Sequence, residues 1–216
     1  MIATLILAVY RWACERLYHE LAPVYEGVAW LVSGGQWSRW RRLALDEVGP
    51  GASLVELGCG PGVLLAEAIR AGYAIVAIDR SPDMTAAAVA RCRRMGVAAN
   101  VVRAAAQQLP LPAAACDGVL ATFPAPYILE PATLAEAARI LRPGGSLVIV
   151  GLWVTVQRPV WQRWLPVFFA SPGPALCRQV LERLAAAGLQ PVLSERVVGW
   201  AAVSVVTALK LPVNKP

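Results

Sequence analysis

Short apolar runs alternate with amphipathic segments along most of the chain. Strands are predicted by apolar runs rich in β-branched residues at 53–57, 74–78, 99–103, 118–122 and 146–152. Helices are predicted by apolar residues at helical spacing over 62–71, 82–95 and 131–141, and in a last segment that starts near Pro174. Fully apolar strands separated by helices are typical of βαβ units with a buried parallel sheet. We therefore expect an α/β fold of the Rossmann-like, doubly wound kind.

The region in front of the first predicted strand follows the helical period instead. Apolar positions fall near helical spacing over 1–20 and again over 22–47, with an interruption at Ser33-Gly34-Gly35. A turn rich in glycine and proline follows this region. We expect residues 1–48 to form a helical cap that is one structural unit with a single domain over 49–216.

A glycine-rich turn leaves the first predicted strand with the sequence Val55-Glu56-Leu57-Gly58-Cys59-Gly60-Pro61-Gly62. Closely spaced glycines let a backbone turn tightly and approach a ligand where side chains would clash. A dinucleotide-binding loop reads G-x-G-x-x-G, and its third glycine would fall at the position of Val63. The acid at Glu56 would repel a pyrophosphate but suits a ligand that carries an ammonium and a sulfonium. A plain strand-to-helix turn has a similar pattern, so the loop alone does not decide the ligand.

Asp79 ends the second predicted strand, 79 − 62 = 17 residues beyond the last glycine of the loop. An acid at this strand tip accepts hydrogen bonds from ribose hydroxyls in nucleoside-binding α/β folds. The alternative is that Asp79 caps the helix that follows, with Pro82 in its first turn. Because the glycine loop stands upstream, the ribose role is favoured, and a ligand with a nucleoside part is predicted.

From Ser53 to about Val150 the chain resembles the class I S-adenosylmethionine-dependent methyltransferases, and the order of motifs is the same. The segment 107–112 (Gln-Gln-Leu-Pro-Leu-Pro) stands where that family has Asp-Ala-x-x-Leu-Pro around the adenine, with Ala105 in place of the aspartate. The segment 135–145 resembles the helix and turn before the fifth strand, a structural motif. The resemblance implies a seven-stranded, mostly parallel sheet and S-adenosylmethionine as cofactor.

The resemblance also implies which residues bind that cofactor. Without an aspartate at position 105, the backbone at Ala106 and the side chain of Gln107 are left to contact the adenine. The full set of implied cofactor-binding residues is Glu56, Gly58, Cys59, Gly60, Pro61, Gly62, Asp79, Arg80, Ala106, Gln107 and Thr122.

A finer resemblance lies in the N-terminal region. The residues Ala22, Tyr25, Glu26, Leu31, Ser33, Gly35, Trp40, Arg41 and Arg42 are similar, without gaps, to the corresponding segment of the ubiquinone/menaquinone C-methyltransferases. In that family the tyrosine–acid pair lies on helices that cap the cofactor and line the acceptor pocket. Two segments depart from the family: 123–127 (Phe-Pro-Ala-Pro-Tyr) replaces Phe-Gly-x-Arg-Asn, and 151–153 lacks Glu-Phe-Ser. A packing role for Trp30, Trp37 and Trp40 stays open.

The acceptor is expected to be a small, apolar molecule, quinone-like or lipid. An amphipathic helix with several aromatic residues is predicted over 157–169, where class I enzymes often place a wall of the acceptor pocket; a core helix is the alternative. The substrate-binding candidates are Tyr25, Trp161, Trp164 and Phe168. If the acceptor needs a general base, Tyr25, Tyr127 and His19 are the candidates by motif position.

Two other functions are alternatives to methyl transfer to a small molecule. A nucleic-acid methyltransferase would need a polar residue followed by Pro-Pro-aromatic after the fourth strand, to hold a flipped base, and 123–127 matches this faintly. No nucleic-acid partner is therefore expected. A non-catalytic module that only binds the cofactor is the other alternative, because Ala105 removes one adenine contact.

Composition adds limits on location and metal binding. Hydrophobic residues make up 57% of the chain, yet no apolar run reaches the roughly 20 residues that a membrane span needs. The formal net charge of +6 is compatible with peripheral contact to anionic lipid, and the odd number of scattered cysteines predicts a reducing, cytoplasmic location. The five cysteines form no C-x-x-C pair and His19 is the single histidine, so no metal site is expected.

Overall fold

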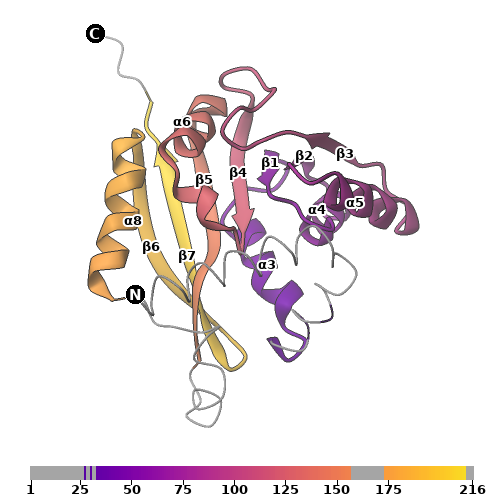
Figure 1. Cartoon of the computed structure of the whole chain (residues 1–216), viewed down its shortest axis with the longest axis horizontal. Helices are drawn as coiled ribbons and strands as arrows, with labels where there is room; N and C mark the ends of the chain where they lie inside the picture. The colour runs from indigo at the N-terminus through magenta and orange to yellow at the C-terminus, as the bar shows by residue number, and fades with distance from the viewer. Residues whose placement is uncertain (1–26, 28–29, 31–32, 157–172, 213–216) are drawn as a thin grey trace, which may run out of the picture.

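The structure, a computed structural model, describes residues 27, 30, 33–156 and 173–212 (Figure 1). Its helices and strands follow one another as α3 (Trp37–Asp46), β1 (Ser53–Leu57), α4 (Val63–Arg70), β2 (Ala74–Asp79), α5 (Pro82–Arg94), β3 (Asn100–Arg103), β4 (Cys116–Thr122), the 3-10 helix η1 (Pro126–Leu129), α6 (Pro131–Ile140), β5 (Leu141–Val156), α8 (Pro174–Ala186), β6 (Leu189–Val198) and β7 (Ala201–Lys210). Of the cap expected over residues 1–48, the described part includes α3.

The seven strands of the described part form one sheet in the order β3-β2-β1-β4-β5-β7-β6 (Figure 1). Strands β1 to β5 run parallel, and β7 lies antiparallel between β5 and β6. The predicted Rossmann-like, mostly parallel fold is confirmed. The chain builds outward from β1 to β3 and then returns to β4, so the order of strands reverses between β1 and β4. Open α/β sheets bind their ligands at the carboxyl ends of the strands at such a point.

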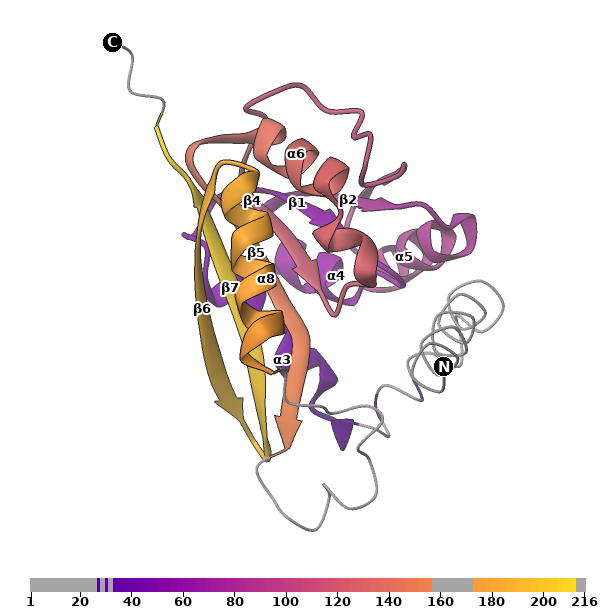
Figure 2. The same cartoon turned by 60° about the vertical axis from the view of Figure 1, so that its left-hand side comes forward.

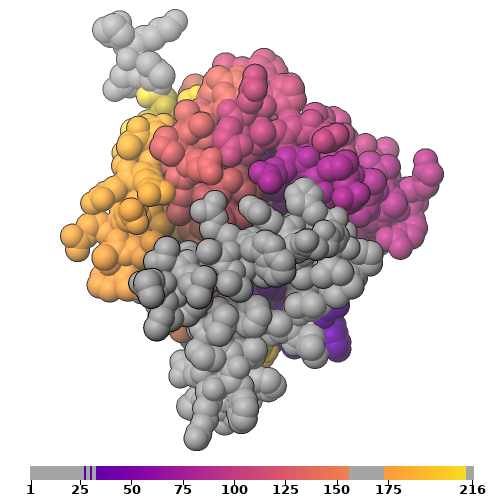
Figure 3. Space-filling view, viewed as in Figure 1, coloured from indigo at the N-terminus to yellow at the C-terminus, as the bar shows by residue number. Residues whose placement is uncertain are grey.

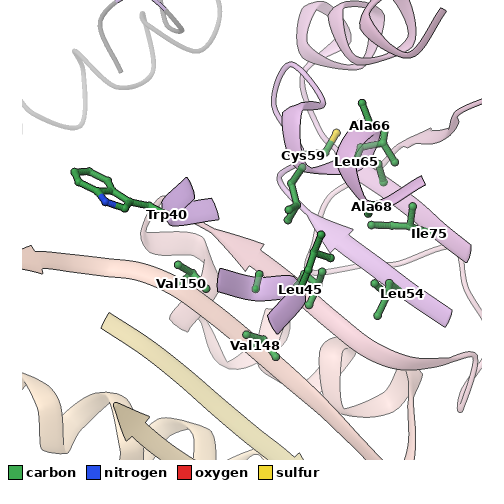
Figure 4. Packing of buried hydrophobic residues seen from close by; sticks show 14 of the residues in the cluster. Trp40, Leu45, Leu54, Cys59, Leu65, Ala66, Ala68, Ile75, Val148 and Val150 are labelled. Atoms are coloured by element: carbon green, nitrogen blue, oxygen red, sulfur yellow. The ribbon is translucent and has the colours of Figure 1, made fainter. Parts of the chain in front are cut away.

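Helices cover both faces of this sheet (Figure 2). Helices α3, α4 and α5 lie on one face, where Leu45, Leu65 and Val148 belong to the buried cluster (Figure 4). Helices α6 and α8 cover the other face, with a second cluster that includes Ile140 and Leu184. Helix α5 and helix α8 lie at opposite ends of the molecule (Figure 3). The parallel strands are therefore buried on both sides, as their apolar sequences predict.

Helix α5 begins at a well-formed cap. The hydroxyl oxygen of Ser81 accepts a hydrogen bond from the Met84 backbone N–H at 3.3 Å, and Pro82 occupies the first helical position. The N-cap of this helix is therefore Ser81, so the alternative that placed Asp79 there is wrong.

The segment Arg142-Pro143-Gly144-Gly145 differs from its prediction as a turn before a strand at Ser146. Strand β5 already begins at Leu141, which pairs with Cys116 of β4. The register shifts before the next pair, Gly118 with Ser146, so the extra residues form a bulge within the strand.

The C-terminal hairpin of β6 and β7 holds α3 against the sheet. The Trp40 indole N–H donates to the Val198 carbonyl oxygen at 3.4 Å. Glu47, which follows α3, forms an ion pair with Arg196 at 2.7 Å and accepts a hydrogen bond from the Thr207 hydroxyl at 3.3 Å. The position of α3 therefore depends on residues about 150 positions away along the chain.

The backbone is unusual at Phe123, which directly follows β4. Its φ of 49° lies in the left-handed region, where a bulky side chain is rare. The Phe123 ring packs against Gly151, where the pairing of β5 with β7 shifts in register, and the Phe123 backbone N–H donates to the Val150 carbonyl oxygen at 2.7 Å. A Cβ atom at Gly151 would clash with carbons of the Phe123 ring, so the glycine is needed for the ring to fit.

The described residues contain no helix long and apolar enough to cross a membrane. The same residues hold no group of three or more histidine, cysteine, aspartate or glutamate side chains that would suit a metal ion.

The packing of Phe123 gives a prediction for Gly151→Ala. The new methyl group would strain a residue at φ 78° and displace the ring, so the free energy of unfolding should fall by about 2–4 kcal/mol. Gly72→Ala is the matched control, because Gly72 has a similar φ of 87° and open space around a Cβ atom. Urea denaturation of both variants tests the account, and equal losses would contradict it.

Candidate active site

The glycine loop between β1 and α4 is tied to the tip of β2. The backbone N–H groups of Gly58 and Cys59 donate to the Ile78 carbonyl oxygen at 2.7 and 3.1 Å. One carboxylate oxygen of Asp79 accepts from the Gly60 N–H and the other from the Ser81 N–H, both at 2.9 Å. Asp79 therefore holds the glycine loop in place. It also lies at the strand tip where a ribose contact was predicted.

Each glycine of the loop has a positive φ, with 69° at Gly58, 52° at Gly60 and 72° at Gly62. A Cβ atom at Gly62 would lie 2.8 Å from the Cβ of Ala88, so this glycine permits close packing of the loop on α5. Within the described part of the chain, no atom beyond the two neighbouring residues lies within 4 Å of a Cβ built at Gly60, which leaves the middle of the loop open to a ligand.

Tyr127, at the start of η1, reaches across to the same loop. Its hydroxyl occupies the space where a Cβ atom of Gly58 would be. The hydroxyl oxygen is buried and has no hydrogen-bond partner among the described residues. Burial, together with the nearby charges of Asp79 and Glu56, raises the pKa of Tyr127. At neutral pH this side chain is therefore a neutral phenol, a hydrogen-bond donor.

Glu56 lies on β1, two residues before the loop, and its side chain is buried with a relative exposure of 1%. The pKa of its carboxyl is raised from 4.5 to about 8, mainly because burial removes water from the charged form. The positive charge of Arg41 opposes this rise, and the negative charge of Asp79 adds to it. The Oε2 atom has no hydrogen-bond partner among the described residues. Glu56 is therefore a buried acid with an open acceptor beside the glycine loop.

Arg41 of α3 is also buried, with a relative exposure of 5%. Its guanidinium lies over the Trp37 ring, 5.4 Å from the ring centroid. The Nε atom has no hydrogen-bond partner within the described part of the chain. We did not predict this burial. The signal for it is the helical spacing of Trp37, Trp40, Arg41, Ala44 and Leu45, which places the arginine on the apolar stripe of α3.

Aromatic side chains gather where β4 and β5 leave this part of the sheet. Trp37 stacks on Phe123 with ring centroids 4.0 Å apart, and Trp40 meets Trp200 edge-on at 5.5 Å. The Trp37 indole nitrogen is buried without a hydrogen-bond partner in the described part. An apolar wall with one open donor thus stands at the carboxyl end of β4. We did not predict Phe123 and Trp200 as members of this wall.

The other predicted cofactor residues lie around the same edge of the sheet. Cys59 is buried in the loop, and burial raises the pKa of its thiol, which is therefore unreactive at neutral pH. The Pro61 carbonyl oxygen accepts from Arg91 at 2.9 Å. Ala106 and Thr122 are buried, the latter as the last residue of β4.

Two of the predicted side chains are directed elsewhere. The Gln107 amide donates to the carboxylate of Glu130 at 2.7 Å. The Arg80 side chain is exposed. The predicted residues Tyr25, His19, Trp161, Trp164 and Phe168 lie outside the described residues.

Comparisons with known proteins identify the family of this chain. A model of a methyltransferase domain matches residues 54–145. The chain is 31% identical, over 87% of its length and 84% of the relative, to a demethylmenaquinone methyltransferase of Renibacterium salmoninarum. A relative with the same name from Mycolicibacterium gilvum is 30% identical, over 88% of this chain and 90% of the relative. The chain belongs to the demethylmenaquinone methyltransferase family. It is an S-adenosylmethionine-dependent methyltransferase.

Solved structures share the fold of this methyltransferase at lower identity. One is described as an S-adenosylmethionine-dependent methyltransferase of Thermotoga maritima, a possible histamine N-methyltransferase, with a TM-score of 0.60, 20% identity and coverage of 87% of this chain and 95% of that one. Another is the [4+2]-cyclase SpnF, with a TM-score of 0.62, 20% identity and coverage of 81% and 82%. Because one fold serves several reactions, these likenesses concern architecture alone.

The residues of the methyltransferase site fit its cofactor. The loop is open at Gly60, and Glu56 presents an unpartnered acid that suits a positively charged ligand. The buried hydroxyl of Tyr127 adds an open donor on the other side of the loop. Unpartnered buried groups are costly in a folded protein, and their gathering at one place indicates that a ligand completes them.

The raised pKa of Glu56 gives a prediction for the cofactor-free methyltransferase. Folded Glu56 keeps its proton up to about pH 8, whereas the unfolded chain loses it near 4.5. Between these values the folded state binds more protons, so this group makes stability fall as pH rises. Glu56→Gln should remove that part of the fall. Between pH 4.5 and pH 8 the unfolding free energy of the variant should therefore rise by a few kcal/mol relative to that of the parent. The scale follows from about 1.4 kcal/mol for each unit by which the pKa is raised.

Urea denaturation of both proteins across this range measures the effect. The cost of burying the glutamine amide is the same at every pH and cancels in the comparison. If the unfolding free energies of the two proteins changed in parallel with pH, Glu56 would have the same pKa in the folded and unfolded states, and the prediction would be wrong.

Proposed function

We propose that this methyltransferase transfers a methyl group to a ring carbon of a small, apolar, quinone-like acceptor that carries a hydrophobic tail. The observation that supports this most is the extent of the family match, which covers 87% of the chain and so reaches beyond the domain at 54–145 into the regions that flank it. The relatives are named for demethylmenaquinone. The apolar wall of Trp37 and Phe123 beside the glycine loop suits a planar ring.

In this proposal the glycine loop and Asp79 hold the cofactor. The carboxylate of Asp79 takes the ribose hydroxyls, and Glu56 faces the amino-acid end. The backbone at Ala106 lies beside the adenine, and the Gln107 side chain would have to leave Glu130 to contact it. When bound, S-adenosylmethionine supplies a methyl group that its sulfonium activates for attack by a nucleophile. The protein's own contribution is orientation and exclusion of water, since close alignment of the reacting atoms lowers the entropic part of the barrier.

The acceptor side needs a group for the proton that is lost. When a ring carbon of a quinol gains a methyl group, a carbon–carbon bond forms and the hydrogen on that carbon leaves as a proton. A raised pKa keeps Tyr127 protonated, which suits it to donate a hydrogen bond to a ring oxygen. Tyr25 and His19 remain the proposed candidates to accept the proton.

The tail of the acceptor belongs to the proposal as well. Burying apolar surface contributes about 25 cal/mol per Å², so a long hydrophobic tail supplies most of the binding free energy. We assign this contact to Tyr25 and to the aromatic segment with Trp161, Trp164 and Phe168. An acceptor of this kind resides in a membrane, so the enzyme would meet it in peripheral contact with the lipid surface.

Turnover tests this function directly. The purified enzyme should transfer labelled methyl groups from S-adenosylmethionine to a reduced, demethylated naphthoquinone with an isoprenoid tail in detergent micelles, and mass spectrometry should place the methyl on the ring. The same quinone already methylated at that carbon is the control and should gain no label. Label that appears only in nucleic acid or in polar metabolites would contradict the proposal.

The ribose role of Asp79 is tested by binding. Asp79→Ala should weaken binding of S-adenosylhomocysteine by about 2–3 kcal/mol, the scale of a lost charge-assisted, bidentate contact. Asp83→Ala, an exposed acid four positions later, is the matched control. Asp79 also holds the loop, so its loss could weaken binding without any ribose contact. Calorimetry with 5′-methylthioadenosine and its 2′-deoxy form separates these two roles.

The parent should bind 5′-methylthioadenosine more tightly than the 2′-deoxy form, and Asp79→Ala should bind both equally. The same preference in both proteins would rule out the ribose contact.

A further inference from the structure

A block of positive charge lies at the end of the molecule that carries α5 and β3 (Figure 1). Residues 84–103 contain four arginines, Arg91, Arg93, Arg94 and Arg103, and no aspartate, glutamate or lysine. The 14 acidic residues of the chain all lie outside this stretch. Charge of one sign is therefore concentrated on α5 and β3.

Most of this charge is free to meet a partner. The side chains of Arg93, Arg94 and Arg103 are exposed, and none of them forms an ion pair within the described part of the chain. Arg91 is different, because it is partly buried and donates to the Pro61 carbonyl oxygen at 2.9 Å. Since a guanidinium keeps its proton in proteins, the three exposed arginines present three permanent positive charges to solvent.

An open groove of about 480 Å³ lies between α5 and β3. Arg93 is in the last turn of α5, and Arg103 is the last residue of β3. The residues that line the groove include these two arginines and the aliphatic Ala86, Val89, Ala90 and Val101. This surface, the α5–β3 groove, therefore combines aliphatic side chains with two cations. Val89 is 43% exposed, so part of its apolar surface remains uncovered.

The α5–β3 groove adjoins the candidate active site. Arg103 pairs in register with Asp79, the residue that holds the glycine loop. The Nε atom of Arg103 donates to the carbonyl oxygen of Arg80, which directly follows Asp79, at 3.3 Å. Helix α5 also packs closely on the loop, with Ala88 against Gly62. A partner that contacts Arg103 therefore lies at the edge of the sheet that carries the site.

The chemistry of the α5–β3 groove favours a membrane over other anionic partners. Surfaces that hold single-stranded nucleic acid combine basic residues with aromatic side chains that stack on the bases. The described residues that line the groove are instead aliphatic or basic, apart from one threonine. Aliphatic side chains beside arginines suit the headgroup region of an anionic bilayer, where the phosphates meet the cations and the apolar groups leave water.

We propose that the α5–β3 groove docks this methyltransferase on an anionic phospholipid membrane. Arg93, Arg94 and Arg103 contact lipid phosphates, and Val89 enters the headgroup region. The proposal rests on the proposed function, which requires an acceptor in a membrane, and it names the face that makes the contact. Each basic residue near an anionic bilayer strengthens binding about fivefold, so the three arginines together contribute about a hundredfold.

Vesicle binding by the full chain tests the groove directly. The test variant combines Arg93→Gln with Arg94→Gln. Its control combines Arg178→Gln with Arg183→Gln, two exposed arginines of α8, which lies at the opposite end of the molecule from α5 (Figure 3) and gives the same net charge. Sedimentation with vesicles of phosphatidylglycerol and phosphatidylcholine measures the partition coefficient. The test variant should bind about 25-fold more weakly than the parent, and the control less than about 3-fold more weakly.

The apolar contact has a variant of its own. Val89→Gln replaces apolar surface by a polar group and should weaken binding to the same vesicles about threefold. Val192→Gln is the matched control, because Val192 of β6 is also an exposed valine, with 66% of its surface accessible, and lies outside the groove. It should bind as the parent does.

Several outcomes would overturn the proposal. Equal loss for the two arginine pairs would mean that net charge alone draws the protein to lipid. An unchanged partition coefficient for Val89→Gln would exclude entry of this face into the headgroup region. If an oligonucleotide bound the parent more tightly than the vesicles do, and the Arg93/Arg94 variant lost that binding, the partner would be nucleic acid. Calorimetry with S-adenosylhomocysteine shows that each variant is folded, since none of these side chains belongs to the cofactor site.

Docking and methyl transfer can be told apart. The vesicles contain no acceptor, so a wrong acceptor leaves every partition coefficient unchanged. If the quinone-like acceptor is right, the Arg93/Arg94 variant should methylate it more slowly than the parent in anionic vesicles and at the parental rate in detergent micelles. Parental rates in both media would contradict docking through the α5–β3 groove while leaving the proposed function intact.

Discussion

Burial of ionisable side chains at the carboxyl end of β1 is the constraint on which the site depends. Glu56 is buried there, and the loss of water raises the pKa of its carboxyl to about 8. The same enclosure covers Arg41 and the hydroxyl of Tyr127. Apolar side chains at this position would stabilise the fold more than these groups without hydrogen-bond partners do. We therefore infer that the groups are kept for binding a charged ligand.

The enclosure is assembled from distant parts of the chain. The sheet places the glycine loop at the reversal of strand order, and the loop is held by Asp79 and by the Ile78 carbonyl oxygen. Helix α3, which carries Arg41 close to Glu56, is anchored by the hairpin of β6 and β7. The same helix supplies Trp37 to the aromatic wall.

The central part of the site was predictable because its signals are local. The strand β1, the glycine spacing and the acid at Asp79 occupy one short stretch, and each has a backbone reason that sequence alone conveys. The resemblance predicted seven strands, but the positions of β6 and β7 were not predicted. The bulge at 142–145 and the left-handed Phe123 were not predicted either, since each depends on pairing or packing with distant residues. The burial of Arg41 likewise needs the hairpin, although its place on the apolar stripe of α3 was visible.

A crystal structure of the protein with S-adenosylhomocysteine is the most direct test of the central claim. We expect the ligand at the carboxyl ends of β1 and β2, with its ribose at Asp79 and its amino-acid end at Glu56. A hydrogen bond from the ligand should then occupy the open Oε2 atom of Glu56. A ligand bound elsewhere, or one whose amino-acid end leaves this atom unpartnered, would contradict the proposed site.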